Sequence, residues 1–155
     1  MQDTPRDNVG MIAPPPLLYA VSLLLGLWLH SLVPLPFARR RQSILGSIFV
    51  GAGFTMDFLA VKTMRRAHTP PSPFAPVRAL VATGPFKVTR NPIYVGFTLL
   101  YTGIALLVNT LWPMLLLPML LNVMRWGAIE REERYLERRF GEEYLAYKER
   151  VPRWI

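Results

Sequence analysis

Four long apolar stretches constrain the fold of this chain more than any other feature. A membrane-crossing helix needs about 20 mostly apolar residues, because each residue adds about 1.5 Å along the helix axis. We therefore expect membrane spans over about residues 17–33, 43–61, 92–108 and 111–124. Hydrophobic residues make up 52% of the chain and charged residues only 18%, a composition typical of membrane proteins. The sequence predicts an all-α, polytopic integral membrane protein in which residues 1–155 form a single domain.

The chain changes character after the fourth apolar stretch. Residues 125–150 are rich in charge, and we expect a cytoplasmic helical region there. Apolar side chains recur at helical spacing as far as Phe140, which predicts an amphipathic helix, and Gly141 breaks the pattern. A short second helix follows, and we expect its Tyr144 and Tyr147 to anchor it at the lipid boundary.

The distribution of cations predicts the orientation in the membrane. With four spans, 15 of the 18 Lys and Arg residues fall on one side and three on the other. The positive-inside rule then places both termini, the long loop over residues 62–91 and the acidic helix in the cytoplasm. The predicted location is a multi-pass position in a bacterial or archaeal cell membrane. The oligomeric state is left open.

The net charge of +8 indicates an anionic partner. Nucleic acid would suit such a charge, but the apolar stretches favour lipid phosphate, so we expect membrane lipids and no nucleic acid. The chain has no cysteine, which excludes disulfides, thiolate metal ligands and cysteine nucleophiles.

A few polar side chains lie inside or beside the predicted spans. Asp57 is an ionisable residue within the second span, which makes it a functional candidate by default, with an ion pair to Lys62 or Arg65 as the alternative. His30 and His68 stand alone, in no metal-ligand spacing, and we predict no metal site.

The stretch GPFKVTRNPIYVG, residues 84–96, lies at the centre of the chain. Its Gly-Pro pair predicts a turn, while Asn91 and Pro92 predict a helix start with Asn91 as the N-cap. Arg90 and Tyr94 therefore gather at the positive end of a helix dipole, at the boundary between membrane and water. Such a position binds anions well.

Two adjacent carboxylates fall in the amphipathic helix. Glu133 lies on its apolar stripe, and a carboxylate in that position needs a partner. That partner is either a ligand or an ion pair with Arg125 or Arg134. We expect Glu132 to pair with nearby arginines.

Two blocks together resemble the isoprenylcysteine carboxyl methyltransferase family and its bacterial relatives. The first is the Gly-Pro-aromatic turn followed by Arg-Asn-Pro-x-Tyr-x-Gly over residues 84–96. The second begins with the Glu-Glu pair and continues through Phe-Gly-x-x-Tyr-x-x-Tyr to Val-Pro, over residues 132–152. The resemblance covers about residues 69–153. Asn91 stands where the eukaryotic prenylcysteine enzymes have histidine, and an amide cannot titrate near neutral pH.

The resemblance implies an S-adenosylmethionine (AdoMet) site built from both blocks. It implies roles for Arg90 and Glu133 in catalysis. It also implies cofactor contact by a set of residues from the loop, the helix start and the acidic pair: Leu80, Val81, Arg90, Asn91, Tyr94, Glu132 and Glu133.

The function that we predict is AdoMet-dependent methyl transfer to a lipophilic substrate at the cytoplasmic membrane face, with carboxyl O-methylation as one form. Methyl transfer to an ionised acceptor needs positioning and exclusion of water rather than a strong base. Two alternatives are a non-catalytic membrane scaffold that binds anionic lipid and a relative of the membrane reductases. The acceptor is left open among a prenylcysteine carboxylate, a phospholipid amine, a small thiol and another lipid.

Overall fold

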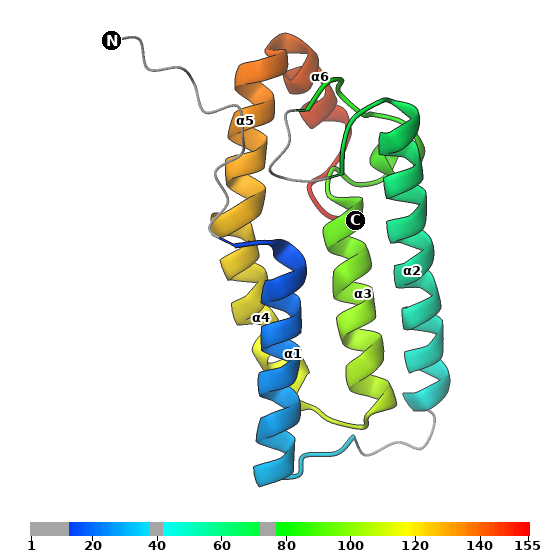
Figure 1. Cartoon of the computed structure of the whole chain (residues 1–155), viewed down its shortest axis with the longest axis vertical. Helices are drawn as coiled ribbons and strands as arrows, with labels where there is room; N and C mark the ends of the chain where they lie inside the picture. The colour runs from blue at the N-terminus through cyan, green and yellow to red at the C-terminus, as the bar shows by residue number, and fades with distance from the viewer. Residues whose placement is uncertain (1–12, 38–41, 72–76) are drawn as a thin grey trace.

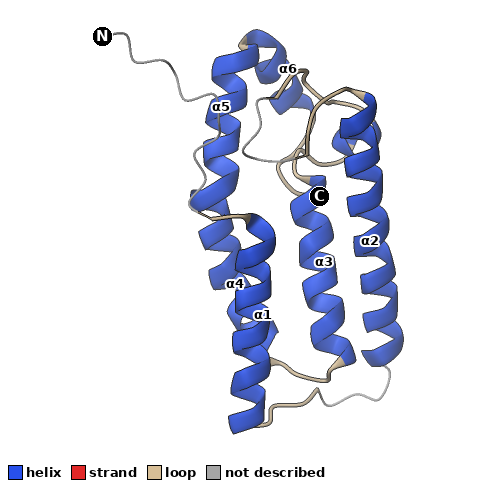
Figure 2. Cartoon of the chain, viewed as in Figure 1, coloured by secondary structure: helices blue, strands red, loops and turns tan. Residues whose placement is uncertain are grey.

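The computed structural model describes residues 13–37, 42–71 and 77–155. The described residues contain helices and connecting loops and no strand, which confirms the all-α prediction (Figure 2). The elements in chain order are α1 Pro15–Leu32, α2 Gln42–Arg66, the 3-10 turn η1 Gly84–Lys87, α3 Pro92–Leu107, α4 Trp112–Met124, the π-helical segment η2 Arg125–Ile129, α5 Glu130–Phe140 and α6 Glu142–Arg150.

Three helices of the described chain are long and apolar enough to cross a membrane: Pro15–Leu32, Gln42–Arg66 and Trp112–Phe140. The third of them is α4 continued without a break through η2 and α5. The structure therefore does not separate the predicted fourth span from the predicted amphipathic helix. α3 is apolar but has only 16 residues, so the count of four spans stays a prediction.

Local sequence explains where these helices begin and end. α1, α3 and α4 each carry proline in the first turn, where its missing N–H leaves no hydrogen bond unmade. Gly141 separates α5 from α6 with a φ of 54°, a backbone conformation that glycine adopts readily. The predicted breaks before Pro92 and after Phe140 are confirmed.

Glycines bring α2 and α3 into close contact. A Cβ placed on Gly53 would lie 2.8 Å from the carbonyl oxygen of Gly96, and one on Gly103 would lie 2.8 Å from that of Gly46. Gly46 and Gly53 of α2 thus face α3 within the chain, where they permit the short distance between the helix backbones.

α1 is tied to α3 and α4 by buried hydroxyl groups. Tyr19 shares a 2.8 Å hydrogen bond with Thr98. The hydroxyls of Ser22 and Tyr101 lie 3.0 Å apart, and Tyr101 also donates to the carbonyl oxygen of Pro113 at 2.9 Å. These bonds hold the apolar helices in register in a medium that offers no water.

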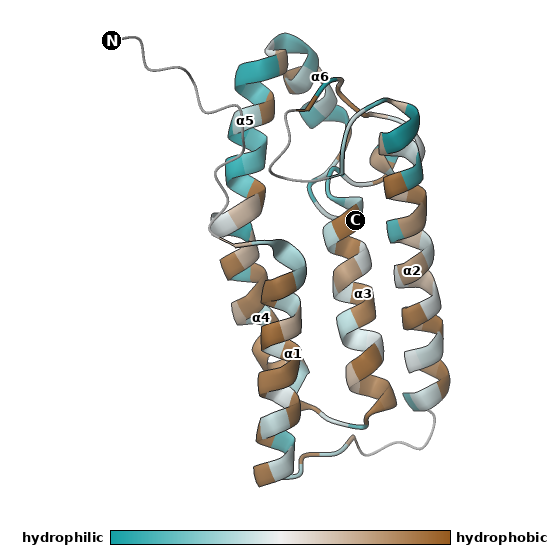
Figure 3. Ribbon diagram, in the orientation of Figure 1, coloured by the Kyte–Doolittle hydropathy of each residue, from teal (hydrophilic) through white to brown (hydrophobic). Residues whose placement is uncertain are grey.

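The helices stand side by side, and the two motif blocks meet at one end of them (Figure 1). The loop that leads into α3 lies there, together with α5 and α6. Apolar residues dominate the helical bundle below and hydrophilic residues cover much of α5 (Figure 3). The cytoplasmic location of this end stays a prediction.

Candidate functional site

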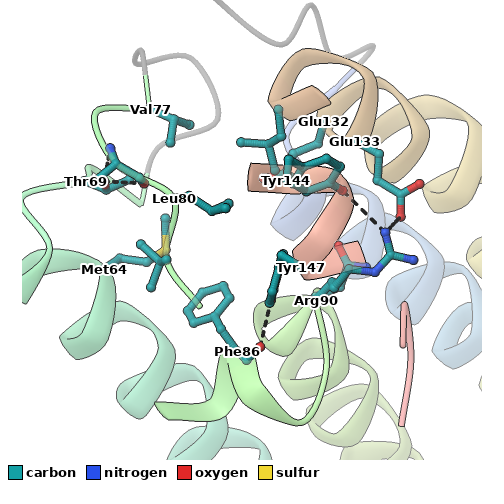
Figure 4. A pocket seen from close by; sticks show the side chains of 14 residues that line it. Met64, Thr69, Val77, Leu80, Phe86, Arg90, Glu132, Glu133, Tyr144 and Tyr147 are labelled. Atoms are coloured by element: carbon teal, nitrogen blue, oxygen red, sulfur yellow. Dashed lines mark hydrogen bonds and ion pairs between the residues drawn. The ribbon is translucent and has the colours of Figure 1, made fainter. Parts of the chain in front are cut away.

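A pocket lies at this end of the bundle, between the long loop, the start of α3, α5 and α6 (Figure 4). It encloses about 540 Å³ of space that no atom fills, including open solvent at its mouth. Its lining residues come from both motif blocks and from the loop: Met64, Thr69, Val77, Ala79, Leu80, Val81, Phe86, Arg90, Asn91, Glu132, Glu133, Leu136, Tyr144 and Tyr147. Six of the seven predicted cofactor contacts are among them, and Tyr94 is the exception.

The start of α3 is held by the segment that follows α6. Asn91 occupies the N-cap position, but its side chain makes no capping bond, so that detail of the prediction is wrong. Its Nδ2 instead donates to the carbonyl oxygen of Arg153 at 3.0 Å, and Thr89 Oγ1 donates to the same oxygen at 2.9 Å. The N–H of Arg90 donates to the carbonyl oxygen of Pro152 at 2.9 Å.

Glu133 lies between two arginines. Arg90 Nη1 is 3.1 Å from Glu133 Oε1, and both side chains are about nine-tenths buried. Arg153 approaches the carboxylate with two prongs, Nε at 2.9 Å from Oε1 and Nη2 at 2.7 Å from Oε2. The alternative of an ion pair for Glu133 is therefore realised with other partners than Arg125 and Arg134.

This cluster is a buried network of hydrogen-bonded charges. Removing both charged groups of an ion pair from water costs several kcal/mol per ion, and close paired geometry offsets that cost. The hydrogen bonds to Glu133 raise the pKa of Arg153, so its positive charge is held firmly. Arg153 Nη1 also lies 4.0 Å from Glu130 Oε1, and Glu130 pairs with Arg125 at 2.9 Å. The connected network of three guanidinium groups and two carboxylates keeps a net positive charge. Arg90 Nε is buried and has no hydrogen-bond partner among the described residues, so one donor is left for a ligand.

Glu132 differs from its neighbour in having an uncharged partner. Tyr94 donates its hydroxyl to Glu132 Oε2 at 3.0 Å. The described residues place no cation within salt-bridge distance of this carboxylate, so the predicted pairing with arginines is wrong within that part of the chain. A carboxylate that lies in a pocket without a cationic partner attracts a cation or a further hydrogen-bond donor.

The two tyrosines of α6 belong to the pocket and not to the lipid boundary, which corrects their predicted role. Tyr144 and Tyr147 are 1% and 3% exposed. Tyr147 donates its hydroxyl to the carbonyl oxygen of Phe86 at 2.7 Å, and Arg90 Nη1 donates to the hydroxyl of Tyr144 at 3.4 Å. Burial raises the pKa of Tyr147 to about 12 and raises that of Tyr144, so both hydroxyls stay protonated near neutral pH.

A second pocket adjoins the first. It encloses about 760 Å³ that no atom fills, including open solvent. Prolines and aromatic or aliphatic side chains from the start of α1, the loop and α3 line most of it: Pro15, Pro16, Pro70, Pro71, Pro92, Ile93, Tyr94 and Phe97. The lining that it shares with the first pocket is Met64, Val77, Phe86, Arg90, Asn91 and Glu132. The apolar space therefore meets the charged one at Arg90, Asn91 and Glu132.

The other polar candidates lie apart from these pockets. Asp57 pairs with neither Lys62 nor Arg65, and it faces the backbone of Gly96 on α3. His30 accepts a hydrogen bond from the backbone N–H of Leu35, a structural role. The described ranges hold no grouping of three potential metal ligands.

Comparison with known proteins assigns the chain to a family. Residues 41–143 match the family model described as Phospholipid methyltransferase, well over half of the chain. The chain belongs to the phospholipid methyltransferase family. The family-level resemblance inferred from the two motif blocks is thereby confirmed, and membership in the phospholipid methyltransferase family supports methyl transfer at a membrane as the activity.

More specific relatives are sparse. An uncharacterized protein of Haemophilus influenzae is 59% identical over 27 residues, which are 17% of this chain and 43% of that protein. This chain thus spans less than half of that relative. No solved structure matches the chain.

Sequence reasoning missed one central member of the site. Arg153 binds Glu133 more closely than Arg90 does, yet its position outside any span or motif helix gave no local reason to single it out. The available indication was the Val-Pro pair of the second block, which Arg153 follows directly.

Proposed function

We propose that the chain is an AdoMet-dependent methyltransferase whose acceptor is lipophilic and enters from the bilayer. The observation that carries the proposal is the meeting of two pockets, one charged and one apolar, at Arg90, Asn91 and Glu132. A methyl donor and an acceptor must lie next to each other for direct transfer, and these two spaces share a boundary. The family assignment supplies the reaction class.

The residues of the first pocket fit the chemical groups of AdoMet. The free Nε of Arg90 and the net positive charge of its cluster suit a carboxylate. Glu132 suits an ammonium or a ribose hydroxyl, and Phe86 offers an aromatic face. When bound, AdoMet supplies an electrophilic methyl group. The protein contributes binding, orientation and exclusion of water.

Arg90 and Glu133 are the residues to which we assign the main catalytic effect, through placement of the donor. Leu80 and Val81 add loop contacts, and Asn91 holds the helix start against the segment after α6.

Glu132 also bears on the choice of acceptor. An acceptor amine must lose a proton, and a carboxylate at the boundary of the two pockets can take it. A carboxylate acceptor is already ionised and would be repelled by Glu132, unless Glu132 is protonated or occupied by the donor. With Glu132 ionised and not occupied by the donor, amine methylation is the form that the site favours; with Glu132 bound to the donor, carboxyl O-methylation is the second candidate.

We place this site at the cytoplasmic face of a single-domain membrane protein with four spans. The excess of cations near the site end supports that orientation, and the apolar composition of α3 is the reason for counting it as a fourth span.

Methyl transfer can be tested with the full chain in nanodiscs that contain a total membrane-lipid extract. AdoMet labelled in its methyl group is added, and label in the organic phase is measured. We expect lipid-extractable label with the natural protein and loss of it with Arg90→Ala. Lys87→Ala removes an exposed cation from the neighbouring turn and should leave transfer unchanged. Absence of extractable label, while AdoMet still binds, would refute the lipophilic acceptor.

The scaffold alternative rests on a different surface. Lys62, Arg65 and Arg66 lie beside the exposed Phe54 and Phe58 on α2, an arrangement that suits anionic lipid headgroups. A scaffold would bind vesicles in proportion to their anionic lipid content and would bind no AdoMet.

A further inference from the structure

We infer that Arg153 is a positioning residue for the donor site: it occupies Glu133 and thereby leaves Arg90 available to the ligand. This inference rests on the proposed function, because it concerns how the same pocket binds AdoMet. The contacts of the described residues carry it in three steps.

The first step is the division of the Glu133 carboxylate between the two arginines. Arg153 contacts both oxygens, at 2.9 and 2.7 Å, whereas Arg90 contacts only Oε1, at 3.1 Å. A two-pronged guanidinium–carboxylate pair is the stronger and more directional of these arrangements. Arg153 therefore satisfies most of the carboxylate's demand for hydrogen bonds.

The second step is that Arg90 keeps a hydrogen-bond donor that no described residue uses. It uses Nη1 for Glu133 and for the hydroxyl of Tyr144, while its Nε is buried without a partner in the described chain. Arg90 lines both pockets, and Arg153 lines neither. Without Arg153, Glu133 would be balanced by Arg90 alone and would draw that guanidinium into a two-pronged pair of its own. The donor and the charge offered to a ligand would then be lost.

The third step separates the side chain of Arg153 from its backbone. The carbonyl oxygen of Arg153 accepts hydrogen bonds from Thr89 and Asn91, and that of Pro152 accepts one from the N–H of Arg90. These backbone bonds fix both sides of Arg90 and remain when the Arg153 side chain is replaced. A substitution at Arg153 thus removes the charge contact while retaining the bonds that hold the helix start.

The experiment is calorimetric titration of the detergent-purified full chain with AdoMet. We expect Arg153→Ala to weaken AdoMet binding roughly tenfold or more. Arg153→Lys should recover part of the affinity, because lysine keeps the charge but cannot form the two-pronged contact. Arg150→Ala is the matched control, because Arg150 is exposed and its side chain, among the described residues, hydrogen-bonds only to a carbonyl oxygen of its own helix.

A double-substitution cycle tests whether Arg153 acts through Glu133. Glu133→Gln keeps a side chain that can hydrogen-bond to both arginines, so we expect it to bind AdoMet more weakly but measurably. On this background, Arg153→Gln should cause little further loss of affinity, because the contact is already weakened. Equal affinity of the natural protein and both Arg153→Ala and Arg153→Lys would overturn the inference, as would additive losses in the cycle. Ligand-free melting curves show which variants are folded. If Arg153→Ala fails to fold, Arg153→Lys and the cycle decide.

The affinity of the natural protein for AdoMet distinguishes a failure of the proposed function from a failure of the positioning role of Arg153. If it binds no AdoMet, the proposed function fails. If it binds AdoMet and the Arg153 variants bind equally well, only the positioning role fails.

Discussion

The glycine contact between α2 and α3 gives a prediction whose size follows from the structure. In Gly53→Ala, the new Cβ would lie 2.8 Å from both the carbonyl oxygen of Gly96 and the Cγ of Leu100. Ordinary contacts of this kind are roughly half an ångström or more longer, so the helices must separate. Such overpacking costs about 1–3 kcal/mol, and the better helix propensity of alanine returns up to about 1 kcal/mol. We expect the free energy of unfolding to fall by about 1–2 kcal/mol.

Gly51→Ala is the matched control two residues away on the same helix. Apart from the backbone of its own helix, a Cβ at Gly51 meets no atom of the described residues within 4 Å. We expect this variant to be neutral or more stable by up to about 1 kcal/mol. The assay is reversible unfolding of each variant in mixed micelles with increasing denaturing detergent, monitored by circular dichroism. Equal stability of the two variants, or a more stable Gly53→Ala, would refute the proposed packing of α2 on α3.

Three further predictions address the site and the topology. Tyr147→Phe should lower the free energy of unfolding by about 1 kcal/mol, because it removes a buried hydrogen bond. Folding raises the pKa of the Tyr147 hydroxyl from 10.0 to about 12, so this group's contribution to the free energy of unfolding is full below pH 10 and is lost as the pH rises towards 12. The fall in the free energy of unfolding between these two pH values should therefore be smaller in Tyr147→Phe than in the natural protein. Asn91→His should retain AdoMet binding in calorimetry, because histidine can still donate a hydrogen bond to the Arg153 carbonyl oxygen. Asn91→Asp cannot donate and should lose AdoMet binding. Tighter binding by Asn91→Asp than by Asn91→His would contradict the role of this hydrogen bond. The natural chain has no cysteine, so single cysteines can be placed by Lys87→Cys and Pro36→Cys. Impermeant reagents should label the first from the cytoplasmic side and the second from the opposite side; the reverse assignment, or labelling of both from the same side, would refute the orientation.

Much of the fold followed from local patterns in the sequence. Apolar length predicted the helices, and Pro92 and Gly141 predicted two of their boundaries, because proline and glycine act on the backbone where they stand. The boundary at Gly141 is the end near Phe140 expected for the amphipathic helix, whose amphipathic character stays a prediction. Its start was not predictable, since the π-helical segment Arg125–Ile129 lets one helix continue where the composition changes.

We predicted which residues line the site better than we predicted which of them contact one another. The motif blocks indicated Arg90, Asn91 and Glu133, and the structure brings these residues to one pocket. The pairing of Glu133 with Arg153 depends on how the segment after α6 returns to the start of α3. A helical pattern carries no information on that return path, because it fixes only neighbours three or four residues apart.

The tyrosines of α6 illustrate the same limit. Aromatic residues near a membrane boundary are typical lipid anchors, which was the basis of the prediction for Tyr144 and Tyr147. Their burial depends instead on the packing of α6 against Leu80, which lies far away in the sequence, and against Leu136 of the preceding helix.

Calorimetry with the purified chain shows directly whether the cluster of Arg90 and Glu133 holds AdoMet. We predict binding of AdoMet and of its demethylated product, lost in both Arg90→Ala and Glu133→Ala. Lys87→Ala and Glu143→Ala replace exposed charges nearby and should bind as the natural protein does. No binding by the natural protein in detergent and in nanodiscs, or unchanged affinity in both site variants, would contradict the account.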